Sequence, residues 1–312
     1  MRRLTIFAHY DKDNIIDGYV LYYLKALKQI SEYIVFVSDC DLPECECSKL
    51  NGLVDYVLAQ KHGEYDFGSY KRGFLLAIEK GLEYDELIFA NDSCIGPFCS
   101  LKPIFERMEK KDYDFWGLTQ NRYLINNEDG KLVYQLLPHI QSYFIVFSKE
   151  VANSSIFYSF MTSIIKENTK DDVVRKYEVE LTRLLTKNGF SYGVWLKHFR
   201  YTENVLLSKY KLLLVKYKYP FLKTSLVKDN LVDCEILNKY NLKSYYPSEL
   251  IKIYQERFKK NVPQGISCSL RDRIFAMLQR NLPVPLFLVY MFVDRKIFSN
   301  IRKVLFYITK NI

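Results

Sequence analysis

Long hydrophobic runs are missing from this 312-residue sequence. The stretch "LPVPLFLVYMFV" at 282–293 holds 12 apolar or proline residues, whereas a helix that crosses a bilayer needs about 20. The N-terminus, "MRRLTIFAHY", lacks the long apolar segment of a secretory signal and leads directly into a predicted strand. We therefore expect no membrane-spanning helix, and the reducing cytosol is the simplest setting for the chain.

Cysteine is present, but not with the spacing of a metal site. Three of the seven cysteines lie close together in "CDLPECEC" at 40–47. This stretch has no Cys-x-x-Cys pair, and no second pair follows at the spacing of a zinc finger. A structural zinc site at Cys40, Cys45 and Cys47 is therefore not expected. Internal repeats and low-complexity tracts are also absent.

Charge and aromatic content narrow the class of partner. The chain has 45 Lys and Arg against 36 Asp and Glu, which gives a formal net charge of +9. This excess favours a polyanionic partner: a membrane surface, a nucleic acid or a phosphorylated substrate. No nucleic-acid-binding motif is recognisable, so nucleic acid is not expected. Most of the 26 Tyr and 21 Phe residues should fill the core, and the rest would suit ring-shaped ligands.

Strand and helix patterns alternate through the first half of the chain. A helical pattern with Ile16, Val20, Tyr23, Leu27 and Ile30 on one face separates "LTIFAHYD" from "YIVFVSD". The strand "VDYVLA", a helix over 70–80 and the strand "ELIFA" continue the pattern, and "DFWGLT" and "SYFIVFS" follow as later strands. The polar segment 121–131 between them indicates a hairpin or a flexible loop. The prediction is an α/β fold, with a mostly parallel sheet flanked by helices.

The character of the sequence changes near residue 201, where a basic and aromatic segment begins. We predict a main domain at 1–225 and a helical, basic C-terminal extension at 226–312. Apolar residues recur on one face of its last helix, with basic residues largely off that face. This pattern favours a helix lying on an anionic membrane surface, although such a face can also pack on the protein itself or on a second subunit. The apolar residues are Ile297, Ile301, Val304, Leu305 and Ile308.

Small polar residues end two of the predicted strands. In "DELIFANDSCIGP" the apolar strand stops at Asn91, Asp92 and Ser93, and the first strand ends in His9, Tyr10 and Asp11. In open α/β sheets, ligands bind in the crevice beyond the carboxyl ends of the strands. These residues are therefore candidates for a ligand site, with ordinary turns as the alternative.

Two further stretches carry possible chemistry. In "HGEYDFGSYKRG", three glycines bracket acidic and basic residues in a loop that opens a helix, a place that can attract phosphate. The spacing matches neither the Rossmann nor the P-loop motif, and a solvated helix start is the alternative. In "RKYEVELTRLLTKNGFSY", Glu178 shares a helical face with Thr182, and Gly189 caps the helix. Glu178 could project into a cleft, although a helical Glu is more often solvated.

Four motifs in order carry a family resemblance: "YDFGSYKRG", "NDSCIGP", "DFWGLT" and "HIQSYFIVF". With "IFAHYDKDN", "YVLYYLKAL" and "YPFLK", the chain resembles the rhamnan synthesis protein F family of bacterial polysaccharide glycosyltransferases. The resemblance covers about Leu4 to Phe221 and implies a GT-A-like fold. It implies transfer of a sugar, most readily L-rhamnose from dTDP-rhamnose, to a cell-surface polysaccharide or lipid-linked glycan. We expect a single displacement with inversion, by a protein located at the inner face of the cell membrane. The alternative is a non-catalytic member that binds a glycan or a partner.

The resemblance also implies roles for particular residues. Glu178 would be the general base. Asp92 would bind a divalent cation, Mg²⁺ or Mn²⁺, although the family's Asp-any-Asp pattern keeps only one carboxylate here. The implied donor-binding residues are His9, Tyr10, Asp11, Ser38, Asp66, Gly68, Lys71, Arg72, Asn91, Asp92 and Ser93. The implied acceptor-binding residues are Trp116, Thr119, His139, Gln141 and Ser142.

Overall fold

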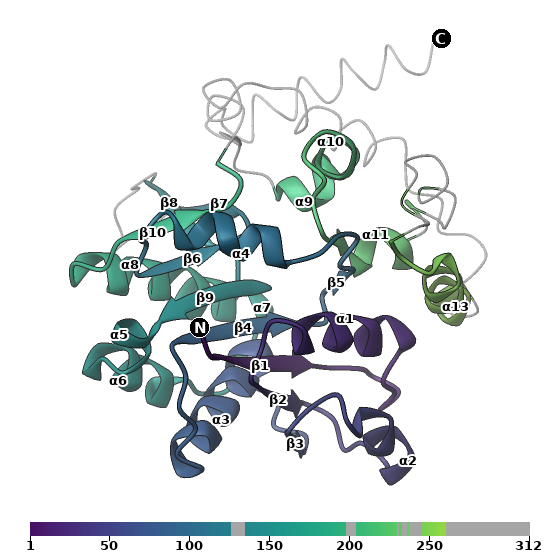
Figure 1. Ribbon diagram of the computed structural model, residues 1–312, viewed down its shortest axis with the longest axis horizontal. Coiled ribbons are helices and arrows are strands. Elements are labelled where there is room, and N and C mark those ends of the chain that lie inside the picture. Colours follow the sequence, from purple (N-terminus) through teal and green to yellow (C-terminus); the bar gives the residue numbers. More distant parts are fainter. Residues whose placement is uncertain are drawn as a thin grey trace, which may run out of the picture.

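The computed structural model describes residues 1–125, 135–197, 204–229, 231–232, 236, 242 and 245–259. Its centre is a seven-stranded sheet in the order β10-β6-β9-β4-β1-β2-β3 (Figure 1). β9 runs antiparallel to both of its neighbours, and the other pairings are parallel. The predicted mostly parallel sheet is therefore confirmed. The strands are β1 (Arg3–His9), β2 (Tyr33–Ser38), β3 (Tyr56–Ala59), β4 (Glu86–Asn91), β6 (Phe115–Gly117), β9 (Phe144–Ser148) and β10 (Tyr192–Val194).

Helices cover both faces of this sheet, so alternate residues of one strand enter different cores. Phe7 and Ile88 face the core beneath α1 (Gly18–Lys28) and α4 (Lys102–Glu109). Ile6 and Phe89 face the opposite core. That second core is covered by α3 (Tyr65–Glu79), α5 (Lys149–Ala152), α6 (Ser155–Ser163) and α8 (Glu180–Lys187), as Figure 1 shows. Strands buried on both faces read as continuous apolar runs, as these do.

Helix α3 begins at Tyr65, five residues earlier than the sequence pattern predicts. The predicted glycine-rich loop is therefore wrong for Gly68 and Gly73, which lie inside the helix. The physical reason is close packing: a Cβ on Gly73 would lie 2.4 Å from Ile6 Cγ2 on β1. The glycine lets the helix approach the strand, and it opens no loop.

Two small sheets lie beside the main one. β5 (Cys94–Ile95) pairs with β11 (Leu222–Lys223), and β7 (Gln120–Ile125) pairs with β8 (Gln135–Ile140), both antiparallel. The second pair is the hairpin expected from the polar segment at 121–131. The first pair joins the "NDSCIGP" and "YPFLK" motifs directly. The remaining elements are α2 (Glu44–Cys47), η1 (Ser48–Leu50), α7 (Lys170–Val173), η2 (Val174–Val179), α9 (Val205–Ser208), α10 (Tyr210–Lys216), α11 (Thr224–Lys228) and α13 (Ser248–Lys259).

Part of the predicted extension packs onto the main domain. Leu226 and Val227 of α11 and Ile251 and Tyr254 of α13 are buried in the same core as α1. The basic amphipathic segment at 297–308, predicted to bind a membrane, lies outside the described residues. In the part of the chain that the structure describes, every helix is too short or too polar to span a bilayer.

Candidate active site

A cavity of about 720 Å³ opens at the edge of the sheet where β1 and β4 end. Its walls come from that edge, from the β8–β9 connection, from the start of α3 and from the 166–178 segment. The sequence-predicted site residues that line it are His9, Tyr10, Asp66, Asn91, Asp92, Ser93, Gln141, Ser142 and Glu178. The fold thus brings together residues from five separate stretches of the sequence.

The "NDS" turn is fixed by hydrogen bonds within the turn and from Tyr10 and Tyr19. The backbone N–H of Tyr10 donates to Asp92 Oδ2 at 2.8 Å, and the Tyr19 hydroxyl donates to the Asp92 carbonyl at 2.9 Å. Asn91 Oδ1 accepts bonds from the N–H and hydroxyl of Ser93, at 3.1 and 2.6 Å. The side chain of Asp92, with 17% of its surface exposed, is therefore fixed at the cavity wall.

The charge on Asp92 has little compensation nearby. Burial raises the pKa of Asp92 to about 7, against the effect of the Tyr10 N–H, and the carboxyls of Asp11, Asp66 and Asp17 add to the rise. His9 Nε2 lies 4.0 Å from Asp92 Oδ2. Burial, however, lowers the pKa of His9 to about 4, so that the ring is neutral at pH 7. A cation or a proton at Asp92 would relieve this imbalance.

Glu178 enters the cavity from η2, a single π-helical segment that precedes α8. Such π-bulges occur frequently at functional sites. Both the N–H and the hydroxyl of Ser142 donate to Glu178 Oε2. The buried His139 Nε2 lies 3.2 Å from Oε1, although it forms no aligned hydrogen bond. Burial favours a raised pKa for Glu178, but His139 and Ser142 outweigh it and bring the pKa below its usual value.

Asp66 contacts the same Ser142 hydroxyl as Glu178, but its pKa is shifted in the opposite direction. Ser142 Oγ lies 3.0 Å from Asp66 Oδ2, and Asn91 Nδ2 donates to the same oxygen at 3.2 Å. Burial, followed by the charge of Glu178, raises the pKa of Asp66. A hydroxyl has one hydrogen to donate. Ser142 can therefore donate its hydroxyl hydrogen to only one of the two carboxylates at a time.

Four lysines line the cavity, and the sequence patterns singled out none of them: Lys61, Lys166, Lys170 and Lys223. Lys223 comes from β11, where Lys223 pairs with Cys94 of β5. Its Nζ donates to Ser93 Oγ at 2.9 Å and lies 4.9 Å from the centre of the Tyr143 ring. The "YPFLK" motif was the available signal for Lys223, since the resemblance already included it.

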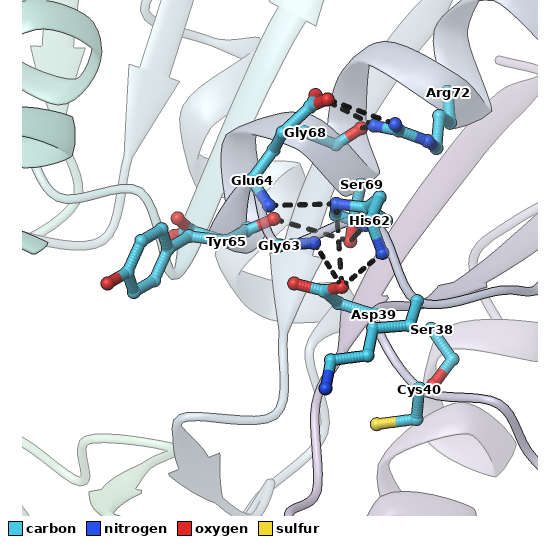
Figure 2. A network of polar contacts seen from close by, with 12 residues as sticks. Ser38, Asp39, Cys40, His62, Gly63, Glu64, Tyr65, Gly68, Ser69 and Arg72 are labelled. Atoms are coloured by element: carbon cyan, nitrogen blue, oxygen red, sulfur yellow. Dashed lines mark hydrogen bonds and ion pairs between the residues drawn. The ribbon is translucent and has the colours of Figure 1, made fainter. Parts of the chain in front are cut away.

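The basic pair predicted to meet phosphate makes other contacts. Lys71 Nζ donates to the Ile164 carbonyl at 2.7 Å. Arg72 lies one turn beyond Gly68 in α3, where it forms an ion pair with Glu64 and donates to the Gly68 carbonyl (Figure 2). None of these three predicted residues, Gly68, Lys71 and Arg72, is among the described residues that line the cavity.

Asp11 and Ser38 lie behind the cavity wall. Ser38 is buried at the end of β2 and bonds His9 Nδ1 at 2.9 Å. Asp11 accepts from Arg257 of α13, whose guanidinium also lies 2.9 Å from Asp17. The predicted C-terminal extension therefore contacts the loop that carries Tyr10.

Three predicted acceptor residues also lie behind the wall. Trp116 packs edge-on against Phe105 in the core and is 4% exposed. The buried Thr119 donates to Gln141 Oε1 at 2.9 Å, and the buried His139 contacts Glu178. Thr119 and His139 thus support residues that line the cavity.

Asp39 is a lining residue that the sequence patterns did not single out. It follows β2 directly, which is the same kind of strand-end position as Asp92. Its Oδ1 accepts from the N–H groups of His62 and Gly63, at 2.6 and 2.7 Å. Figure 2 shows these contacts meeting at one oxygen, while the other oxygen points away from them. The carboxylate is oriented and retains an acceptor for a ligand.

The described residues do not form a complete metal site by themselves. Among them, no three His, Cys, Asp or Glu side chains are grouped so that they could hold an ion. Mg²⁺ is often held by one or two carboxylates together with substrate phosphates. Asp92, with its raised pKa and acidic neighbours, fits that shared arrangement.

Comparison with known proteins gives two distant relatives. The chain is 27% identical over 157 residues to the uncharacterized protein y4gN of Sinorhizobium fredii, which covers 50% of this chain and 39% of that protein. It is 28% identical over 197 residues to the virulence protein VirA of Vibrio anguillarum, which covers 62% of this chain and 59% of that protein. The chain thus spans less than two thirds of the length of each relative.

Solved structures resemble this chain only distantly, with low TM-scores. A 4-diphosphocytidyl-2C-methyl-D-erythritol synthase from Anaerococcus prevotii superposes with a TM-score of 0.40 and 11% identity, over 65% of this chain and 94% of that one. Core-mannan synthase A from Aspergillus fumigatus, in its Mn/GDP form, gives 0.35 and 10%, over 59% and 69%.

The family profile of rhamnan synthesis protein F matches residues 34–291. The match begins later than the resemblance drawn from the motifs, which starts at Leu4. It also runs well past Phe221, where the resemblance drawn from the motifs ends, so that expected C-terminal bound is corrected. Because the match spans more than half of the chain, the protein belongs to the rhamnan synthesis protein F family, a glycosyltransferase-like family.

Proposed function

We propose that this protein transfers a sugar from a nucleoside diphosphate to a hydroxyl group of a glycan acceptor. The observation that carries the proposal is the 720 Å³ cavity, which unites strand-end carboxylates, four lysines and an ionised glutamate. Strand-end carboxylates and lysines suit a diphosphate, and a glutamate suits a hydroxyl that must lose its proton. The family description, rhamnan synthesis, favours dTDP-L-rhamnose as the donor.

The donor would lie along the ends of β1, β2 and β4. The accepting oxygen of Asp39 suits a ribose or base group, and the exposed rings of Tyr10 and Tyr65 offer flat faces to the base. Lys223, beside Ser93, would meet the negative charge of the diphosphate. Asp92, with the donor phosphates, would hold a divalent cation, which when bound supplies further positive charge against the leaving group.

Glu178 would be the general base of a single displacement. The acceptor oxygen attacks the anomeric carbon, Glu178 takes the hydroxyl proton, and the bond to the diphosphate breaks, so that the configuration inverts. The lowered pKa of Glu178 keeps it ionised near pH 7. Ser142 and His139 fix the direction of its carboxylate, which a base must present to the acceptor.

The acceptor proposed is a polysaccharide or lipid-linked glycan at the inner face of the cell membrane. Gln141 and Ser142 line the cavity on the side of Glu178 and would contact its sugar hydroxyls. The rival function is a non-catalytic member that binds a nucleotide sugar or glycan and transfers nothing. The single carboxylate of the "NDS" turn is the observation that favours this rival.

The test compares donor binding with transfer in the full-length protein. Calorimetric titration with dTDP-L-rhamnose should give saturable binding that weakens when a chelator removes divalent cations. Glu178→Gln should leave donor affinity nearly unchanged and slow transfer by about a hundredfold or more. Glu180→Gln is the matched control, because Glu180 lies on the exposed face of α8, paired with Arg183, and should change neither quantity.

Each outcome separates the alternatives. Wild-type turnover in Glu178→Gln would exclude Glu178 as the base. Donor binding without turnover in the wild-type protein, with acceptor glycans present, would favour the non-catalytic member. Asp92→Asn should abolish transfer with the fold intact, and unchanged turnover in that variant would refute the assigned donor site.

A further inference from the structure

A second cavity, of about 320 Å³, lies beside β10, the edge strand of the sheet. It is formed by the residues that follow this strand, by the end of α4 and by the end of α10. The described lining residues are Arg107, Met108, Lys111, Tyr113, Val194, Trp195, Leu196, Lys197 and Tyr217. None of them lines the larger cavity, so the mechanism proposed above does not use them.

The charged residues of this lining are all cations, and its aromatic rings offer flat faces. Arg107, Lys111 and Lys197 supply three cations, and none of them forms an ion pair with a described residue. No acidic side chain is among the described lining residues. Lys197 Nζ lies 2.9 Å from the Tyr113 hydroxyl and 5.4 Å from the centre of its ring.

Aromatic rings complete the wall. Trp195 and Tyr113 are half-buried, which leaves part of each ring to the cavity. Aromatic faces pack against the apolar faces of sugar rings, and unpaired cations bind anionic groups. A ligand that combines a ring with an anionic group fits both features.

The strand order relates the second cavity to the first. β9 runs antiparallel to both β4 and β6, and β10 runs parallel to β6. β10 therefore points the same way as β4, and Trp195 lies at the same sheet edge as Asp92. The larger cavity opens at this edge, and the second cavity reaches it at Trp195.

A chain of contacts joins the two cavities. The Trp195 ring lies 5.8 Å from the Tyr219 ring, and the Tyr219 hydroxyl bonds the Tyr143 hydroxyl. Tyr143 in turn lies 2.8 Å from Thr119 Oγ1, which donates to Gln141 in the wall of the larger cavity. Buried hydroxyls of this kind hold two sites at a fixed separation.

We propose that this second cavity binds an anionic sugar unit, carrying either a phosphate or a carboxylate. That this cavity binds a distal sugar unit of the acceptor chain rests on the proposed function. The binding itself does not, because the cations and aromatic rings are separate from the donor cavity. An extended acceptor would then reach Glu178 with its terminal hydroxyl while its anionic unit lies at Trp195.

The sequence provides its own reporter, since it has two tryptophans, Trp116 and Trp195. In Trp116→Phe, fluorescence reports on the second cavity alone. Glucose 1-phosphate and glucuronate should each give a saturable change, and the tighter ligand identifies the anionic group. Glucose alone and inorganic phosphate alone should bind at least tenfold more weakly. Saturating dTDP should not displace either ligand.

The variants assign the binding to the named cations. Arg107→Gln combined with Lys111→Gln should weaken glucose 1-phosphate binding at least tenfold. Lys110→Gln is the matched control, because Lys110 is exposed at the end of α4 and is not among the lining residues. If Trp116→Phe does not fold, calorimetry on the wild-type protein and the charge variants gives the same comparison.

Two results would overturn the proposal: no saturable binding of either anionic sugar, or equal binding by the double variant and by Lys110→Gln. If dTDP-L-rhamnose still binds in those experiments, only the second site fails. If neither the donor nor the anionic sugars bind, the proposed function fails with it.

Discussion

At the scale of single residues, Asp92 is the least favourably placed charge at the candidate site. Its pKa of about 7 lies above the usual aspartate value of about 3.9 because it is buried among other carboxylates. The folded protein therefore binds a proton between about pH 4 and pH 7 that the unfolded chain does not. The stability that this proton provides is complete below about pH 4 and is lost as the pH rises through 7.

Asp92→Asn should remove this pH dependence. Without donor or divalent cation, the variant and the wild type should have similar free energies of unfolding near pH 4. At pH 8 the variant should be more stable, by on the order of 3 kcal/mol. Urea unfolding at a series of pH values measures this difference. His9, which titrates in both proteins, cancels from the comparison, and a difference that stays constant with pH would contradict the prediction.

Individual residues also show how far sequence reasoning reaches. Asp92 and Glu178 were predicted because each has a local signal, a strand end and a helical position, and both line the cavity. The sequence around Lys223 does not indicate that this lysine lies at the cavity. Its position there depends on the pairing of β11 with β5, about 130 residues earlier. Asp39 has a local signal, its position directly after a strand, whereas the residue expected from the sequence is its neighbour Ser38. Gly73 was misjudged because a glycine in a helix and a glycine in a loop look alike until the strand beneath is known.

At the scale of elements, α13 connects the C-terminal part of the chain with the loop that carries Tyr10. Its Arg257 contacts the carboxylates of Asp11 and Asp17, all three side chains being less than one fifth exposed. Tyr10 directly precedes Asp11, and the Tyr10 N–H donates a hydrogen bond to the Asp92 carboxylate. Removing the guanidinium would leave two partly buried carboxylates without their counter-ion.

Arg257→Met keeps much of the apolar stem and removes the charge. We expect the free energy of unfolding to fall by about 3 kcal/mol, and dTDP affinity to fall as the loop loses its anchor. Arg257→Lys should recover part of both losses. The control is Arg175→Met, which breaks an exposed pair with Asp172 and should cost at most about 1 kcal/mol. Urea unfolding and dTDP titration provide the two measurements, and an Arg257→Met variant as stable as the control would refute the coupling.

At the scale of the whole molecule, apolar and basic residues meet on one part of the surface. Leu207, Leu212 and Val215 of α9 and α10 are 39%, 42% and 44% exposed. Lys211 and Lys216 lie in α10, the same short helix as Leu212 and Val215. The sequence adds the basic amphipathic segment at 297–308, outside the described residues. Both features fit attraction to an anionic membrane surface, at about 1 kcal/mol for each basic residue.

The chain should therefore float with vesicles that contain phosphatidylglycerol and remain behind with neutral vesicles. Deleting Val284 to Ile312 should release it without loss of dTDP binding. Leu212→Ser with Val215→Ser should weaken flotation, while Ile253→Ser, at an exposed position of α13, is the control. If the intact chain never binds anionic vesicles, or if the deletion variant binds as before, the membrane assignment is wrong.

The pairing of β5 with β11 also has a consequence for synthesis of the protein. Ser93 is made 130 residues before the lysine that bonds it. At about 5–20 residues per second, the nascent chain carries the strand-end carboxylates without that lysine for roughly 6 to 26 seconds. During this interval β5 also lacks its partner strand. We therefore expect a ribosome-bound chain that stops before Leu222 to be unable to retain a nucleotide, so that the proposed sugar transfer begins only after the second half of the protein has emerged.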